Sequence, residues 1–265
     1  MDLQLKDQHV LITGGSKGIG LACAAGFLQE GAKVSLVSRE VANLERAQKT
    51  LSAQAPATAD RIAVYAANLR QSDDALAALR AAEQHFGPVD VLVNSAGAAR
   101  RTAPDALDAA AWHEAMDAKY FTYIHMIDPV VKRMGARGRG VIVNVIGAGG
   151  KVASPVHMAG GAANAALMLV SAGMAAAYGP KGVRVNAVNP GVTSTDRMQE
   201  GLKTDAKLQG IDTEEALKRT IARMPLGRIA TPVEIANAVV FLASPMASYI
   251  TGAVLAMDGA VTPMI

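Results

Sequence analysis

The sequence predicts a single α/β domain, a doubly wound parallel sheet of about seven strands with helices on both faces. Three observations indicate this class. Short apolar runs alternate with longer helical patterns along the 265 residues, and a glycine-rich loop follows the first apolar run. No linker, repeat or low-complexity segment divides the chain. We therefore expect residues 1–265 to form one domain.

The apolar runs are predicted as strands at 9–13, 33–38, 62–66, 89–94, 141–146, 183–188 and 253–257. Helical patterns lie near 18–30, 40–54, 72–86, 106–134, 155–179 and 231–243. This alternation is typical of βαβ units with right-handed crossovers. One long polar stretch, 194–228, interrupts it and is predicted to be helical only at 213–224. A stretch of this length in a compact domain indicates a lid over a site.

Composition excludes several classes of protein. The residues are 51% hydrophobic, and the net charge of +3 comes from 26 basic and 23 acidic residues spread along the chain. Neither nucleic acid nor a membrane surface is an expected partner. Cys23 is the single cysteine, so an intrachain disulfide and a cysteine-rich metal site are excluded, and no metal is expected. The N-terminal residues lack a secretion signal, and no uninterrupted apolar run is long enough to cross a bilayer; we expect a cytoplasmic protein.

The glycine-rich loop has the pattern of a phosphate-binding turn. It reads Thr13-Gly14-Gly15-Ser16-Lys17-Gly18-Ile19-Gly20, between a predicted strand and a predicted helix. Glycine lets the backbone approach a pyrophosphate, and the helix N-terminus offers free N–H groups to it. Alone, such a loop also fits a tight turn that binds nothing.

Further motifs along the chain match one family. Asn94-Ser95-Ala96-Gly97 ends the fourth predicted strand, and Asn186-Ala-Val-Asn-Pro-Gly-Val192 with Thr195 follows the sixth. Pro225-Leu-Gly-Arg228, Thr251-Gly252 and Asp258-Gly259 lie near the end. With the glycine-rich loop, these motifs resemble the short-chain dehydrogenase/reductase family over essentially the whole chain. The resemblance implies a Rossmann fold, a nicotinamide dinucleotide cofactor and a homo-oligomer, a tetramer or dimer, built through the helices near 106–134 and 155–179.

The resemblance also implies which residues bind the cofactor. Three groups are expected to contact the pyrophosphate and adenosine ribose, the adenine, and the nicotinamide. In chain order these residues are Gly14, Ser16, Lys17, Gly18, Ile19, Gly20, Ser38, Arg39, Asn68, Leu69, Asn94, Ala96, Gly97, Pro190, Gly191, Val192 and Thr195.

The end of the second predicted strand favours NADP(H) over NAD(H). An acidic residue at this place binds a free ribose 2′-hydroxyl and repels a 2′-phosphate. Here the strand ends Val37-Ser38-Arg39 with no acid before Glu40. Arg39 and Lys17 could clamp the phosphate from two sides. Both could equally be surface cations, and Glu40 leaves NAD(H) open.

Members of the resembled family usually carry an Asn-Ser-Tyr-Lys set, and this chain departs from it at each place. Counting back from Ala165-Ala166-Leu167, the lysine place holds Asn164 and the tyrosine place Gly160. Thirteen residues before Gly160, the serine place holds Gly147, and Lys119 stands where the asparagine is usual.

Two residues could carry proton transfer instead. His157 lies seven residues before Asn164, the spacing of the displaced tyrosine in the enoyl-reductase branch of the family. Its ordinary pKa near 6.5 suits proton donation, although a capping or solvated histidine fits as well. Lys119 could restore the positive charge lost at position 164, or it could reach solvent as an ordinary surface lysine.

The sequence therefore predicts an NADP(H)-dependent oxidoreductase acting on a small-molecule carbonyl, alcohol or activated double bond. Two alternatives stay open: an NADP-binding sensor or structural protein without turnover, and an enoyl-reductase-like enzyme. Arg100 and Arg101 could meet an anionic substrate group or could be solvated loop charges. Met198 and Leu202 in the predicted lid suit an apolar substrate but equally fit packing within the lid.

Overall fold

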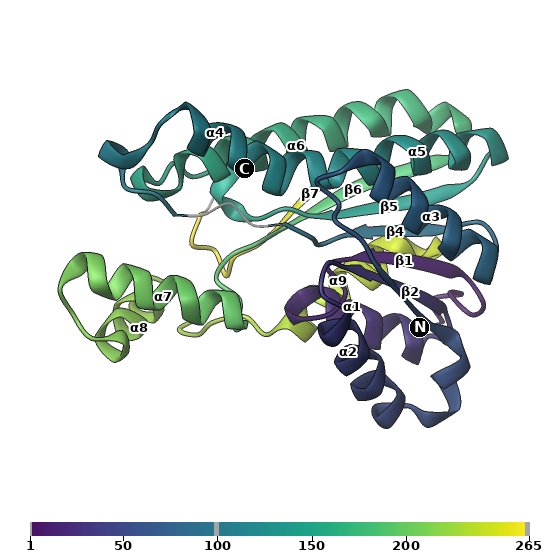
Figure 1. Cartoon of the computed structure of the whole chain (residues 1–265), viewed down its shortest axis with the longest axis horizontal. Coiled ribbons are helices and arrows are strands. Elements are labelled where there is room, and N and C mark those ends of the chain that lie inside the picture. Colours follow the sequence, from purple (N-terminus) through teal and green to yellow (C-terminus); the bar gives the residue numbers. More distant parts are fainter. Residues whose placement is uncertain (1, 98–100, 263–265) are drawn as a thin grey trace.

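The structure, a computed structural model, describes residues 2–97 and 101–262. Its strands are β1 (His9–Thr13), β2 (Lys33–Ser38), β3 (Ile62–Ala66), β4 (Val91–Asn94), β5 (Gly140–Val145), β6 (Val183–Pro190) and β7 (Val254–Met257). They form one parallel sheet in the order β3-β2-β1-β4-β5-β6-β7 (Figure 1). The predicted fold class is confirmed, and each predicted strand ends within two residues of the observed one.

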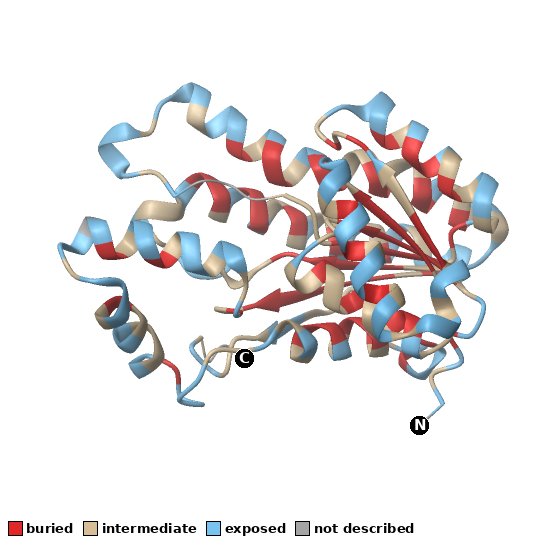
Figure 2. Cartoon of the chain, turned by 60° about the horizontal axis from the view of Figure 1, so that its bottom comes forward, coloured by how far each residue is buried: buried red, intermediate tan, exposed pale blue. Residues whose placement is uncertain are grey.

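Helices cover both faces of the sheet. One face carries α1 (Gly18–Gln29), α2 (Val41–Gln54) and α9 (Pro232–Ala243), and the other carries α3 (Ser72–Phe86), α5 (Thr122–Arg137) and α6 (Met158–Tyr178). Successive strand residues point to opposite faces, so Val10 and Ile12 of β1 join the first core and Leu11 the second. The central strands are buried on both sides, the edge strand β7 is partly exposed, and the outer helix faces are exposed (Figure 2).

The prediction of one continuous helix at 106–134 is wrong. The stretch is divided into α4 (Ala109–Ala115), a π-helical turn at Met116–Phe121, and α5. Periodicity alone does not reveal this, because a π-helical turn leaves the chain helical on both sides. The turn matters for the site because it carries Lys119.

The stretch 194–228 contains two helices where the sequence predicted one. They are α7 (Asp196–Gln209) and α8 (Thr213–Ala222), which project beyond the strand ends (Figure 1). Leu202, Ala206 and Ala216 form a small core between them. The first helix was missed because most of its residues are polar.

One helical stretch among the described residues, Pro155–Lys181, is long and apolar enough by length and composition to cross a membrane. By length and composition alone, this stretch departs from the expectation that no apolar run is long enough to cross a bilayer. In the fold this stretch contains α6, which packs along β6 and buries Ala163, Leu167 and Ala175. A helix that lies against the sheet in this way is explained by the domain core.

Candidate functional site

The predicted cofactor residues come together at one edge of the sheet. All of them lie at, or just beyond, the carboxyl end of a strand, and parallel strands end at the same edge. The strand order reverses between β1 and β4, whose loops carry the glycine-rich turn and Asn94–Gly97. A crevice beside such a reversal is where doubly wound sheets bind nucleotides.

The glycine-rich turn is held by backbone contacts that exclude side chains. The N–H of Gly14 donates to the Val37 carbonyl oxygen over 2.8 Å. Gly14 has a φ of +66°, and a Cβ there would lie 2.8 Å from the Ala96 backbone. A Cβ on Gly20 would lie 2.3 Å from the Gly14 carbonyl oxygen, so α1 can begin this close only with glycine.

The first turn of α1 fits a phosphate group. The residue before the helix, Lys17, makes no side-chain capping hydrogen bond. The N–H groups at the start of a helix have no partner within it and attract anions through the helix dipole. This end of α1 could therefore hold the pyrophosphate of a dinucleotide.

The end of β2 presents two cations beside this turn. The Ser16 hydroxyl donates to the Ser38 hydroxyl over 3.0 Å, which joins the turn to β2. Lys17 and Arg39 are both exposed. Glu40 is also exposed and is the N-cap residue of α2. Its backbone carbonyl oxygen accepts a hydrogen bond from the Asn43 N–H.

A chain of buried hydrogen bonds crosses the sheet beneath this edge. Thr13 Oγ1 accepts from the Ser95 and Ala96 N–H groups and donates to Asn94 Oδ1 over 3.3 Å. Asn94 Nδ2 donates to Asn144 Oδ1, and Asn144 Nδ2 donates to Ser171 Oγ, each over 2.9 Å. These contacts tie β1, β4 and β5 to α6 directly under the site.

Glycines pack the loop after β5 onto α6. Gly147 has a φ of +128°, and a Cβ there would lie 3.4 Å from Asn164 Nδ2. A Cβ on Gly161 would lie 2.7 Å from the Gly149 carbonyl oxygen, closer than real Cβ contacts. The glycine at position 161 is therefore explained by close packing of α6 against this loop.

Lys119 is buried at the same edge and does not reach solvent. Its side chain is 7% exposed, and Nζ donates to Tyr123 Oη over 2.8 Å and to the Val145 carbonyl oxygen over 3.3 Å. The Tyr123 hydroxyl also donates to that carbonyl. Nζ lies 4.4 Å from the centroid of the Tyr123 ring. Burial, and then the charge of Arg197, lowers the pKa of Lys119 to about 7.

His157 lies next to the same loop, immediately before α6. A Cβ on Gly149 would lie 3.0 Å from Cδ2 and 3.4 Å from Nε2 of the His157 ring. Its Nδ1 is buried without a hydrogen-bond partner among the described residues. Burial, followed by the charges of Arg101 and Lys119, lowers the pKa of His157. The structure thus brings the two candidates for proton transfer into one electrostatic environment.

Two arginines connect α7 to the loop after β4. Arg197 Nη1 donates to the Gly97 carbonyl oxygen over 3.0 Å, and Arg101 forms an ion pair with Asp205. Arg100 lies outside the described residues. Met198 and Leu202 pack within the small core of α7 and α8. Sequence analysis missed Arg197 and Tyr123; the spacing of Tyr123, four residues after Lys119 on one helical face, is the signal that could have found it.

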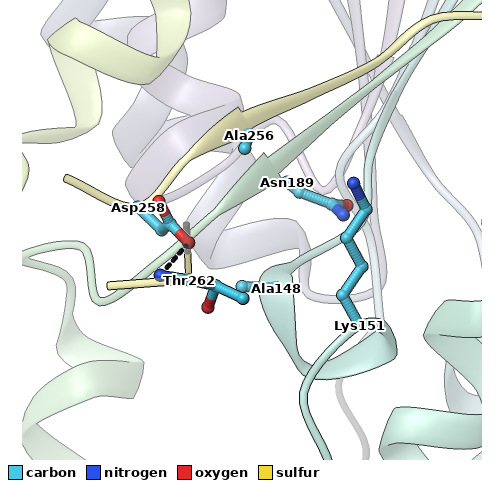
Figure 3. A pocket seen from close by; sticks show the side chains of 6 residues that line it. All are labelled: Ala148, Lys151, Asn189, Ala256, Asp258 and Thr262. Carbon is cyan, nitrogen blue, oxygen red and sulfur yellow. Dashed lines mark hydrogen bonds between the residues drawn. The ribbon is translucent and has the colours of Figure 1, made fainter. Parts of the chain in front are cut away.

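A small pocket opens at the carboxyl ends of β6 and β7 (Figure 3). It holds about 20 Å³ and is lined by Ala148, Lys151, Asn189, Ala256, Asp258 and Thr262. Asp258 accepts from the N–H of Thr262, which closes the turn after β7. The pocket adjoins the glycine loop after β5, which contributes Ala148 to its lining. Among the described residues no group of His, Cys, Asp or Glu could hold a metal ion.

Comparison with known proteins decides the family. A family model described as enoyl-(acyl carrier protein) reductase matches residues 14–262. The chain is 39% identical over 264 residues to 2-(S)-hydroxypropyl-CoM dehydrogenase 3 of Xanthobacter autotrophicus, covering 99% of each chain. This protein belongs to the short-chain dehydrogenase/reductase family.

Solved structures of other short-chain dehydrogenases/reductases have the same fold. L-Sorbose reductase from Gluconobacter frateurii, complexed with NADPH and L-sorbose, matches 100% of both chains with a TM-score of 0.92 and 29% identity. An NADPH-bound short-chain oxidoreductase from Pseudomonas aeruginosa, described as containing an atypical catalytic center, matches 97% of this chain and 98% of its own, with a TM-score of 0.87 and 29% identity. The similarity therefore extends over the whole domain, including α7 and α8.

Proposed function

We propose that this short-chain dehydrogenase/reductase is an NADP(H)-dependent oxidoreductase acting without the usual Asn-Ser-Tyr-Lys set. It transfers hydride to or from a carbonyl/alcohol pair or an activated double bond. The observation that carries the proposal is Lys119, a buried amine with a pKa of about 7 at the edge of the sheet where the predicted cofactor residues meet. A group with this pKa near neutral pH can both give and take a proton.

The cofactor proposal is supported by the residues around the glycine-rich turn. The start of α1 would hold the pyrophosphate, and Lys17 and Arg39 would pair with a 2′-phosphate at the end of β2. Pro190, Gly191, Val192 and Thr195 would line the nicotinamide side. The NADPH complexes of the two similar structures support NADP(H) rather than NAD(H). When bound, the cofactor supplies or accepts the hydride.

The geometry supports replacement of the family's catalytic set. Gly147 has a φ of +128°, a backbone conformation that a serine rarely adopts, so this loop suits a glycine in the serine place. Asn164 is buried in the lysine place and carries no charge. The described atypical center of the Pseudomonas aeruginosa oxidoreductase supports this proposal.

In reduction, the Lys119 ammonium gives its proton to the substrate atom that becomes negative when hydride arrives. The neutral amine then regains a proton from water that enters when the product leaves. Tyr123 and the Val145 carbonyl hold Nζ in place through the hydrogen bonds described above. His157 is neutral near pH 7 because its pKa is lowered, and it can donate a hydrogen bond to the substrate oxygen.

We further propose that α7 and α8 form a lid over the site, as the contacts of Arg197 and Arg101 with the body support. A cytoplasmic homo-oligomer is also proposed. Its contact face would include the outer sides of α4 and α6, where Trp112 is 40% and Leu169 77% exposed.

The test follows NADPH oxidation by absorbance across a panel of ketones, aldehydes, enones and enoyl thioesters. We expect Lys119→Met to lower kcat by roughly 10²–10⁴-fold, the usual contribution of a general acid. Lys181→Met is the matched control, because Lys181 also lies over a tyrosine, Tyr178, at 5.0 Å but at the opposite edge of the sheet. Equal rates in both variants would contradict the role of Lys119. Tight NADPH binding with no turnover on any panel member would favour a sensor.

The enoyl-reductase alternative has one observation in its favour. The matching family model is described as enoyl-(acyl carrier protein) reductase, and His157 stands near the loop after β5. In this case enoyl thioesters would be reduced faster than ketones, and His157→Ala would remove more activity than Lys119→Met. The reverse order would exclude it.

A further inference from the structure

Arg197 has a position that the proposed reaction does not explain. It lies in the first turn of α7, directly after the loop expected to line the nicotinamide, and its side chain is exposed. Its one described hydrogen bond is to a carbonyl oxygen, that of Gly97. Within the described residues, no carboxylate lies within salt-bridge distance of its guanidinium. A guanidinium held in this way keeps further N–H donors for another acceptor.

The Gly97 carbonyl places Arg197 above the π-helical turn. Gly97 packs so closely there that a Cβ would lie 2.3 Å from the Ala118 carbonyl oxygen and 2.9 Å from Thr122 Oγ1. Ala118 immediately precedes Lys119 on the chain, and Thr122 follows it by three residues. The contact with Gly97 therefore places the guanidinium on the loop that packs against the turn carrying Lys119, and its charge acts on Lys119 and on Tyr123.

The other charges at this opening are largely paired or neutral. Arg101 pairs with Asp205 of α7, and the N–H of Thr102 donates to the Val156 carbonyl oxygen over 3.0 Å, which brings Arg101 beside His157. His157 is neutral near pH 7 because its pKa is lowered. Glu200, one turn along α7 from Arg197, is exposed and opposes its charge only at a distance. Asp196, which precedes Arg197 on the chain, is also exposed, and among the described residues it forms no ion pair with Arg197, so the guanidinium stays open to an external anion.

We propose that the substrate of this oxidoreductase carries an anionic group, a carboxylate, sulfonate or phosphate, which the Arg197 guanidinium binds at the mouth of the site. The inference rests on the proposed function and specifies its substrate class. Arginine matches such groups because its parallel N–H donors bind two oxygens at once.

Binding of the anion also prepares the proton donor. Burial, and then the charge of Arg197, lowers the pKa of Lys119 to about 7, so near neutral pH the amine of the free enzyme is only partly protonated. An anion on Arg197 cancels part of that charge, and the pKa of Lys119 rises. Lys119 is then charged when the substrate is in place, and substrates lacking the anion leave it partly neutral.

The first experiment compares acetoacetate with methyl acetoacetate as substrates for NADPH oxidation. We expect kcat/KM at least tenfold higher for the acid, mainly through KM, and a pKa in the kcat profile above that in the kcat/KM profile. Arg197→Gln should remove both differences, and Arg197→Lys should restore part of them. Arg219→Gln, an arginine on α8 paired with Glu215, is the matched control and should change neither. Equal kcat/KM for acid and ester would overturn the inference while leaving the proposed function intact.

The second experiment does not depend on turnover. Propionate, propanesulfonate and propyl phosphate are titrated against propanol by calorimetry, with the protein saturated with NADP⁺. We expect at least one anion to bind tenfold more tightly than propanol, and the ranking identifies the anionic group. Arg197→Gln should abolish the difference. Anion binding that is unchanged in Arg197→Gln, or equal to that of propanol in the wild type, would contradict the inference even if no substrate is reduced.

Discussion

The two halves of the site are built in different ways. The proposed cofactor half uses consecutive residues, Thr13–Gly20, whose glycines let one backbone touch another. The proposed reaction half collects single side chains from the π-helical turn, α5, α7 and the turn before α6. The backbone geometry of the glycine-rich turn depends on a local sequence motif. The chemistry of the other half depends on side chains that only the fold brings together, and these side chains can change while the fold stays the same.

The largest expected effect comes from a substitution that disturbs the backbone of the glycine-rich turn. Gly20→Ala places a methyl group 2.3 Å from the Gly14 carbonyl oxygen, so the turn or α1 must move. We expect destabilisation by about 3 kcal/mol and loss of NADPH binding by 100-fold or more, because overpacking and a displaced phosphate site act together. Thermal unfolding and NADPH fluorescence titration measure the two effects.

The matched control is Gly201→Ala. This glycine also lies in a helix, α7, but nothing lies within 4 Å of the position of its Cβ. The substitution should stabilise the protein by about 0.5–1 kcal/mol through helix propensity. If Gly20→Ala also stabilised the protein, the close approach of residue 20 to the Gly14 carbonyl would not be what requires glycine there.

The reaction half should respond in the opposite direction. A buried amine costs stability, so Lys119→Met should raise the free energy of unfolding while it removes activity. We expect a gain of about 2 kcal/mol near neutral pH and a Tm higher by roughly 4–8 °C. The Tyr123 hydroxyl still donates to the Val145 carbonyl in this variant, so that oxygen keeps a partner.

The pH dependence of this gain has a definite sign. The pKa of Lys119 falls from 10.5 in the unfolded chain to about 7 in the fold, so between these values the unfolded chain binds more protons. Wild-type stability therefore rises with pH across this window because of Lys119. The advantage of Lys119→Met should be largest below pH 7 and vanish near pH 10.5. Denaturant unfolding at several pH values checks this, and a constant difference would mean that Lys119 is not desolvated.

The smallest expected effect comes from removing Arg39, and it concerns the affinity for NADPH relative to NADH. Arg39 is exposed and touches neither core, so its removal should leave stability within about 0.5 kcal/mol. We expect Arg39→Ala to raise the Kd of NADPH roughly tenfold and to leave that of NADH nearly unchanged, because only NADPH carries the 2′-phosphate. Arg46→Ala, on the exposed side of α2, should change neither Kd. An equal loss of affinity for NADPH and NADH would mean that Arg39 attracts both cofactors through its charge and does not recognise the 2′-phosphate.

Sequence reasoning predicted the strands that carry the proposed cofactor half more completely than the helices that carry the proposed reaction half. The strands are continuous β-branched or apolar runs, so their ends were predicted within two residues. The helix α7 was missed, although Met198, Leu202 and Ala206 recur every fourth residue along it. Lys119 and His157 were singled out by position, but the partners of Lys119 were not, although the four-residue spacing of Tyr123 was a usable signal. Tyr123 hides in a core helix, and Arg197 meets Gly97 across one hundred residues of chain.

The hydrogen bonds beneath the site have only one consistent arrangement of protons. Two N–H groups point at the Thr13 hydroxyl, so its own hydrogen must go to Asn94. That choice orients the Asn94 amide, which orients the Asn144 amide, and Ser171 passes its hydrogen on to the Leu167 carbonyl. The loop after β4 thereby fixes the direction of every hydrogen bond from Thr13 across two strands to α6, two helical turns from Asn164. An aspartate at position 144 would occupy the same space but would reverse the last of these bonds, because it has no hydrogen to give to Ser171.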